Sequence, residues 1–244
     1  NKQDIIQKSR LVTLNSQERK ELFRDFRPVL ILLFITNLTL VVLRDIKEDF
    51  LVKIIDTTEH SSWMFAQVDS VVTLIILTLF GMMVFMKNNI KVLIILLGLV
   101  MMSSLCMSFL SFYYDALQLS PICWLFIQSL SLYIPYLCFQ SIFFDRFIAC
   151  FKIRGNVGFF IVTIDFIGYT GTVLILFLKE FYSPNINWLD FYNQLSGYVG
   201  ILCTAAFACS MAYLIQRHRK ECVSREEVFV SEPPVASTEI LQNI

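Results

Sequence analysis

The chain has 244 residues, of which 56% are hydrophobic and only 16% charged, and its mean hydropathy is +0.64. A soluble domain carries roughly a quarter charged residues, so this composition excludes an ordinary water-soluble domain as well as a disordered chain. The formal net charge is zero, which argues against nucleic-acid binding, because neutralising phosphates takes a clustered basic surplus. The composition predicts a protein whose solvent is the lipid bilayer.

Six apolar blocks follow a polar segment, 1–25, that has no apolar stretch of its own and is predicted to be a cytoplasmic linker. Each block approaches the roughly 20 residues that a membrane-spanning helix needs. The predicted fold is therefore all-α, a polytopic membrane protein with a six-helix bundle over 26–216. The predicted spans are 26–48, 64–86, 90–114, 117–150, 157–181 and 191–215.

The two ends of the chain carry further predictions. Residues 217–244 are polar and contain Pro233 and Pro234, so we predict a disordered cytoplasmic tail. The chain begins with Asn1 instead of Met, and we expect it to be part of a longer polypeptide in which 1–25 belongs to a central loop.

Lys and Arg are distributed unevenly between the two ends of the predicted helices. With a cytoplasmic N-terminus, sixteen of the 20 lie on the cytoplasmic side. Because Lys and Arg accumulate in cytoplasmic loops, both termini are predicted to be cytoplasmic. The four on the opposite side are Arg44, Lys47, Lys53 and Lys179.

Polar residues are concentrated in the first, second, fourth and fifth spans, whereas the third and sixth are largely apolar. Two three-helix repeats, in which the first two helices of each line a pathway and the third faces lipid, would produce this distribution. The alternative is a chance distribution in a small sample.

The first span is predicted to continue through Arg44, because its uninterrupted apolar run covers only about 24 Å of a core about 30 Å thick. Asn37, Arg44 and Glu48 are spaced seven and four residues apart and therefore share one helix face. Asp69 on the second span lies at a similar depth, and we predict an Arg44–Asp69 ion pair near the outer mouth. The alternative is that Arg44 extends to the lipid headgroups.

In the fourth span, Tyr133, Tyr136 and Gln140 form a polar stripe at i, i+3 and i+7. Pro135 lies within the stripe and is expected to kink the helix. Such a stripe can bind a substrate or bend during a transport cycle. Equally, tyrosine and glutamine side chains can simply join one helix to another.

The fifth span places Asp165 near the middle of the membrane, with Tyr169 one turn later on the same face. A carboxyl group buried there favours its neutral form, as a proton-coupling site requires. We therefore predict that both residues belong to a substrate or ion pathway. The alternative is a permanently protonated Asp165 that hydrogen bonds to a neighbouring helix.

No metal or other cofactor is expected, and the chain is not expected to be an enzyme. The seven cysteines form no CxxC pair, and the only histidines, His60 and His218, lie near opposite ends of the chain. Structural metal sites need clustered Cys and His ligands. The HExxH and GxSxG motifs are also absent from the sequence.

One segment, FFDRFIACFKIRGNVGFFIVTIDFIGYTGTV, contains Asp145, Arg146 and Arg154 and resembles the junction between the tenth and eleventh helices of major facilitator superfamily (MFS) carriers. Taken with KELFRDFRPVL, LRDIKEDF, MKNNIKVL and SPNINWLDF, it is similar to the second half of an uncharacterised bacterial family of MFS-like multi-pass membrane proteins. The resemblance covers about 20–219.

This resemblance implies a twelve-helix carrier of the inner membrane, of which the chain supplies helices seven to twelve. The partner bundle would be an N-terminal six-helix half of the same polypeptide or a separate subunit. Asp145, Arg146, Arg154 and Lys87 would then belong to the gating or cytoplasmic loops. The acidic and basic signature usual between the second and third helices is reduced here to Gly81, Lys87, Asn88, Asn89 and Lys91.

The expected function is one half of a secondary active transporter that works by alternating access on an unknown small-molecule substrate, with proton coupling as one option. The alternative is a non-transporting membrane sensor or scaffold that retains a carrier fold. The reduced loop at Lys87 is the feature that favours the alternative.

Overall fold

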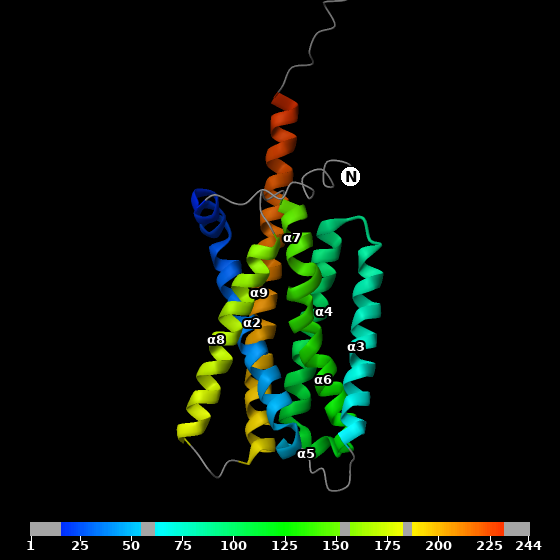
Figure 1. The fold of residues 1–244 in the computed structure, drawn as a ribbon. Coiled ribbons are helices and arrows are strands. Elements are labelled where there is room, and N and C mark those ends of the chain that lie inside the picture. Colours follow the sequence, from blue (N-terminus) through cyan, green and yellow to red (C-terminus); the bar gives the residue numbers. More distant parts are fainter. Residues whose placement is uncertain (1–15, 55–61, 152–156, 183–186, 232–244) are drawn as a thin grey trace, which may run out of the picture.

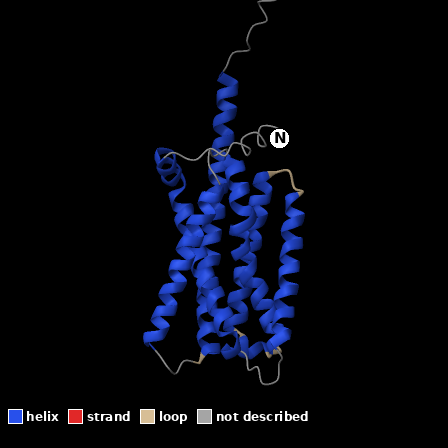
Figure 2. Ribbon diagram, in the orientation of Figure 1, coloured by secondary structure: helices blue, strands red, loops and turns tan. Residues whose placement is uncertain are grey.

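The computed structural model describes residues 16–54, 62–151, 157–182 and 187–231. Over these residues the protein is all-helical, and its long helices lie side by side along one direction (Figures 1 and 2). The elements are α2 (Ser16–Ile54), α3 (Ser62–Val84), α4 (Asn89–Phe112), α5 (Tyr114–Leu117), α6 (Pro121–Cys138), the π-helical turn η1 (Phe139–Phe143), α7 (Phe144–Phe151), α8 (Val157–Tyr182) and α9 (Trp188–Ser231).

The apolar lengths confirm a multi-pass membrane protein. Within the described residues, five stretches are long and apolar enough to cross a bilayer. The sixth predicted span corresponds to α8, whose described apolar stretch, Ile161–Leu174, is shorter than the others. The five are Phe26–Asp49, Trp63–Val84, Asn89–Phe112, Pro121–Phe151 and Trp188–Lys220.

The bundle has two distinct ends (Figure 1). Helix α2 begins and α9 ends at one of them, which we call the terminal end, whereas α5 lies at the other, the α5 end. Helices α3 and α8 flank the bundle on opposite sides, with α2, α6 and α9 between them.

Helix pairing follows the pattern expected of two three-helix repeats. The fourth span comprises α6, η1 and α7. The first repeat is α2, α3 and α4, and the second is the fourth span, α8 and α9. Helix α2 packs on α8 as the fourth span packs on α3, and α2 packs on α9 as the fourth span packs on α4. The third helices of the repeats, α4 and α9, make the most extensive contact of all. Because each repeat has three spans, the second runs opposite to the first, which is the inverted arrangement found in many transporters.

The contact between α4 and α9, called the seam below, depends on small residues. A Cβ added at Gly200 would lie 2.2 Å from Ser108 Oγ and 2.7 Å from the Ser104 carbonyl oxygen. The Ser108 hydroxyl donates to the Gly197 carbonyl oxygen at 2.9 Å. Because Gly200 has no side chain, the two backbones can approach closely.

The fourth span continues through Pro135, and the π-helical turn begins at Phe139, about one helical turn later. Proline has no N–H, so the carbonyl four residues earlier, that of Ser131, loses its helical donor. Ser103 of α4 replaces it, donating its hydroxyl to the Ser131 carbonyl oxygen at 2.8 Å. The proline thus ties the fourth span to α4.

Both terminal helices extend beyond the predicted spans. Helix α9 runs to Ser231, so residues 217–231, which were predicted to belong to a disordered tail, are helical. The reason is that 217–231 contains neither Gly nor Pro to end the helix at the membrane surface. Helix α2 likewise begins at Ser16, inside the predicted linker. Residues 1–15 and 232–244 lie outside the described part of the chain.

Candidate functional site

Near the α5 end, α2, α3 and α6 meet at a buried lysine. Lys47 is only 2% exposed, and its ammonium group donates to Asp69 Oδ1 of α3 at 3.0 Å. It also donates to the Tyr133 hydroxyl of α6 at 3.2 Å and lies 4.5 Å from the centre of that ring. The Tyr133 hydroxyl in turn donates to Glu48 Oε1 at 2.9 Å. One lysine therefore links three helices.

The predicted Arg44–Asp69 ion pair is wrong, because Asp69 pairs with Lys47 instead. The error follows from the predicted end of the first span at Glu48, whereas α2 continues to Ile54. Lys47 and Asp69 each lie seven residues from the α5 end of their own helix. They are therefore at equal depth in the bundle.

Arg44 faces α6 and its own neighbour on α2. Its Nε donates to Asp45 Oδ1 at 2.8 Å, and a second nitrogen donates to the Tyr136 hydroxyl. The guanidinium carbon lies 4.6 Å from the centre of the Tyr136 ring, and Glu48 Oε1 is 3.9 Å from Nε. Asp45 also accepts a hydrogen bond from Thr172 of α8, so Arg44 and Asp45 join α2 to both α6 and α8.

Asp165 is held by the fourth span. Gln140, in the π-helical turn, donates its side-chain amide to Asp165 Oδ1 at 2.9 Å. Both side chains are half-buried. Tyr169 is exposed. Of the eight predicted pathway residues, six thus make polar contacts between α2, α3, α8 and the fourth span, namely Arg44, Asp69, Tyr133, Tyr136, Gln140 and Asp165.

Close packing of α8 on α2 makes this meeting possible. A Cβ at Gly171 would lie 2.3 Å from Leu38 Cδ1, and one at Gly168 would lie 2.9 Å from Val41 Cγ2. The two glycines let the helices approach, as small residues do in membrane proteins. This proximity places Thr172 against Asp45.

Asn37 is a predicted pathway residue that stands apart. It is 1% exposed, and neither atom of its amide group has a hydrogen-bond partner in the described structure. Although it shares a helix face with Arg44, it lies in the interior of the bundle.

At the terminal end, Arg146 of α7 braces the connection between α3 and α4. Its guanidinium donates to Asn89 Oδ1 at 2.8 Å and to the carbonyl oxygens of Met83 and Val84 at 3.3 and 3.2 Å. Those two carbonyls belong to the last turn of α3, where the helix supplies no donor of its own. Lys87 is exposed in the same connection.

Asp145 precedes Arg146 on α7 and is half-buried. Arg154 lies outside the described residues. The side chains joined between α2, α3, α8 and the fourth span are called the polar cluster below; they are Arg44, Asp45, Lys47, Asp69, Tyr133, Tyr136, Gln140, Asp165 and Thr172. Sequence reasoning missed three of them, namely Lys47, Asp45 and Thr172.

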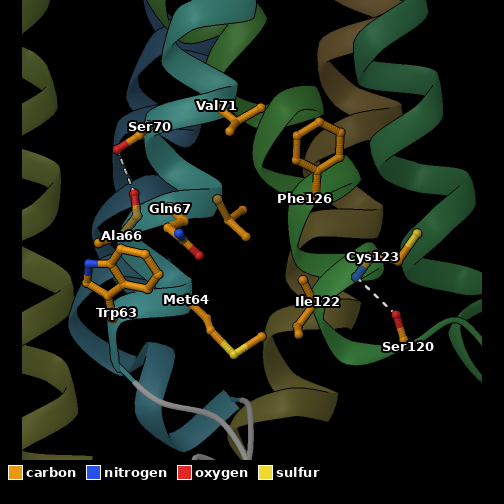
Figure 3. A pocket seen from close by; sticks show the side chains of 11 residues that line it. Trp63, Met64, Ala66, Gln67, Ser70, Val71, Ser120, Ile122, Cys123 and Phe126 are labelled. Carbon is orange, nitrogen blue, oxygen red and sulfur yellow. Dashed lines mark hydrogen bonds between the residues drawn. The ribbon is translucent and has the colours of Figure 1, made fainter.

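A separate groove of about 930 Å³ opens between the first turns of α3 and α6. Met64 and Gln67 on one helix and Ile122 and Phe126 on the other border it (Figure 3). None of the charged residues of the polar cluster lines this groove. Within the described residues, no group of three or more His, Cys, Asp or Glu side chains is placed to hold a metal ion.

Residues 1–217 match a family of unknown function (DUF5690). The chain belongs to this family. The match agrees with the resemblance to an uncharacterised family, whereas kinship with MFS carriers stays a prediction. No curated protein and no solved structure matches the chain.

Proposed function

We propose that this chain is the six-helix half of an MFS-like secondary transporter that moves a small molecule by alternating access. The observation that carries the proposal is the polar cluster, whose ionisable members include Arg44, Asp45, Lys47, Asp69 and Asp165. It joins α2, α3, α6 and α8, the first two helices of each repeat, and leaves out the seam.

The energetics of this cluster favour a functional origin. Ion pairs away from water contribute little to stability, because desolvation offsets the attraction between the charges. Ionisable side chains within membrane spans are correspondingly rare and usually mark substrate or ion routes. Lys47 is nearly fully buried, and an apolar residue there would pack at lower desolvation cost.

Alternating access needs a second bundle against which this one can rock. In the proposal, that partner is an N-terminal six-helix half of the same polypeptide or a separate subunit, and the substrate lies between the two. The protein resides in the cell's inner membrane with the terminal end in the cytoplasm, as the distribution of Lys and Arg predicts.

Asp165 is the proposed coupling residue. It is half-buried, and its hydrogen-bond donor, Gln140, is neutral. No salt bridge to Asp165 occurs among the described residues. The polar cluster thus contains two cations in ion pairs and, in Asp165, a carboxylate that accepts a hydrogen bond from a neutral amide.

The experiment uses the full-length protein in vesicles loaded with the pH indicator pyranine, to which classes of small solutes are added in turn. Wild-type protein should move protons with one class, and Asp165→Asn should abolish the proton movement. Arg44→Gln should reduce transport of the same solute. Arg219→Gln, at an exposed position near the terminal end of α9, is the control and should transport like wild type. Full proton coupling by Asp165→Asn would contradict the coupling role, and no flux with any class would favour a sensor or scaffold.

A further inference from the structure

The π-helical turn Phe139–Phe143 is the one irregular turn in the described part of the fourth span. A π turn is equivalent to an α-helix that carries one extra residue, and such turns occur mostly at functional sites. Here the turn includes Gln140 on one side and buried Phe139, Ile142 and Phe143 on the other. The extra residue is therefore accommodated where the fourth span meets Asp165.

Two polar contacts lie near the two ends of the π-helical turn. Gln140, at its start, holds Asp165 of α8. Arg146, three residues after its end, holds Asn89 and two carbonyls of α3. The first contact belongs to the proposed pathway and the second to the connection between α3 and α4 at the terminal end.

Helix geometry makes the second contact depend on the turn. Each residue of an α-helix adds about 100° of rotation and about 1.5 Å of rise. If η1 relaxed to α-helical geometry with all its residues, α7 would turn by about 100° relative to α6. Helix α6 cannot follow easily, since Ser103 holds the Ser131 carbonyl and Lys47 holds Tyr133. Arg146 would then leave its partners.

We propose that η1 is a register switch that couples the state of Asp165 to the opening of the terminal end. With Gln140 bound to Asp165, the π turn is held and Arg146 clamps the connection between α3 and α4. When a proton or cargo occupies the Asp165 carboxylate, Gln140 is released, the turn relaxes and the clamp opens. That opening serves transport only if the proposed function holds, but the coupling itself is a property of the fold.

Deletion of Ser141 tests the switch directly. Ser141 is exposed, and its hydroxyl bonds only to the Leu137 carbonyl of its own helix. Without it, the remaining residues form a regular α-helix whose two flanks keep their present positions, so the clamp should stay closed. Ser141→Ala retains the extra residue and is the matched control.

The readout is amide hydrogen exchange of the connection between α3 and α4 in the full-length protein in lipid nanodiscs. Exchange there should be about tenfold slower in the deletion variant than in wild type, because the opening that exposes these amides is lost. Ser141→Ala should exchange at the wild-type rate. Equal exchange in the deletion variant and wild type would overturn the proposal.

A second pair of variants keeps the proposal testable if the deletion variant does not fold. Gln140→Leu and Asp165→Leu each remove one partner of the same hydrogen bond, so each should speed exchange by about tenfold, and the double variant should do no more than either alone. Additive effects, or no effect, would overturn the switch. Hydrogen exchange needs no substrate, so an absence of solute flux would reject the proposed function without deciding this outcome.

Discussion

Two regions hold the bundle together in different ways. One is the seam between α4 and α9, and the other is the polar cluster between α2, α3, α6 and α8. The seam uses glycine, serine and apolar side chains, with backbones close enough for Ser108 to reach the Gly197 carbonyl. The polar cluster uses charges and tyrosines, among them Lys47, Asp69 and Tyr133. Packing of the first kind is specific to one arrangement, whereas ion pairs can exchange partners with water or a ligand.

The comparison indicates a division of work within the bundle. The seam joins the two repeats through close backbone packing, whereas the polar cluster joins α2, α3, α6 and α8 through side-chain contacts. Substitutions in the seam should therefore affect the folded state first. Substitutions in the polar cluster should affect activity at smaller losses of stability.

The largest effect on stability is expected at Gly200. Gly200→Ala puts a Cβ 2.7 Å from a backbone carbonyl of α4, which a side-chain rotation cannot relieve. Overpacking of this kind should lower the unfolding free energy by about 3 kcal/mol. Thermal unfolding in detergent measures it, and Gly98→Ala, where no described atom lies within 4 Å of the added Cβ, is the control. Equal stability of the two variants would contradict the close packing of the seam.

A smaller effect is expected at Lys47. Lys47→Met leaves the Asp69 carboxylate without its cation, but that side chain is 42% exposed, so solvent replaces part of the interaction. The unfolding free energy should fall by about 1–2 kcal/mol, below the loss typical of fully buried pairs.

The matching test is a double-mutant cycle with Asp69→Leu, measured by the same unfolding experiment. The double variant should lose less than the sum of the single losses, because neither charge is left without its partner. Strict additivity would show that Lys47 and Asp69 do not interact.

The smallest effect is expected at the Pro135 junction. Ser103→Ala removes the donor to the Ser131 carbonyl and should lower stability by about 1 kcal/mol. In a Pro135→Ala background the restored N–H can take the carbonyl, so the same substitution should then cost less. An equal loss in both backgrounds would mean that Ser103 does not compensate for the proline.

Much of the fold could be predicted from the sequence because hydropathy alone sets the number and position of apolar helices. The helix ends could not. Hydropathy marks where a helix leaves the membrane, but α2 and α9 continue beyond it. Neither 49–54 nor 217–231 contains Gly or Pro, and at its other end α2 continues through Pro28 to Ser16. The π turn had only indirect signals, namely Pro135 and the length of the fourth span.

Contacts within the candidate site were harder to predict than the positions of its polar side chains along the chain. Residues with polar side chains in apolar blocks, such as Asp165 and Gln140, stand out in the sequence, and the structure brings those two together. Lys47 lies in a run of charges at the end of the first span, where nothing in the sequence tells a buried lysine from an exposed one. Its pairing with Asp69 depends on where α2 ends.

The central claim is that the polar cluster lines a water-accessible route, and cysteine accessibility tests it most directly. In a full-length protein with the native cysteines replaced by alanine, Tyr169→Cys on α8 is compared with Ile201→Cys on α9, two positions exposed in the bundle. A water-soluble thiol reagent should modify position 169 readily in membranes and leave position 201, which we expect lipid to cover, unmodified. Equal protection of both positions would contradict the claim.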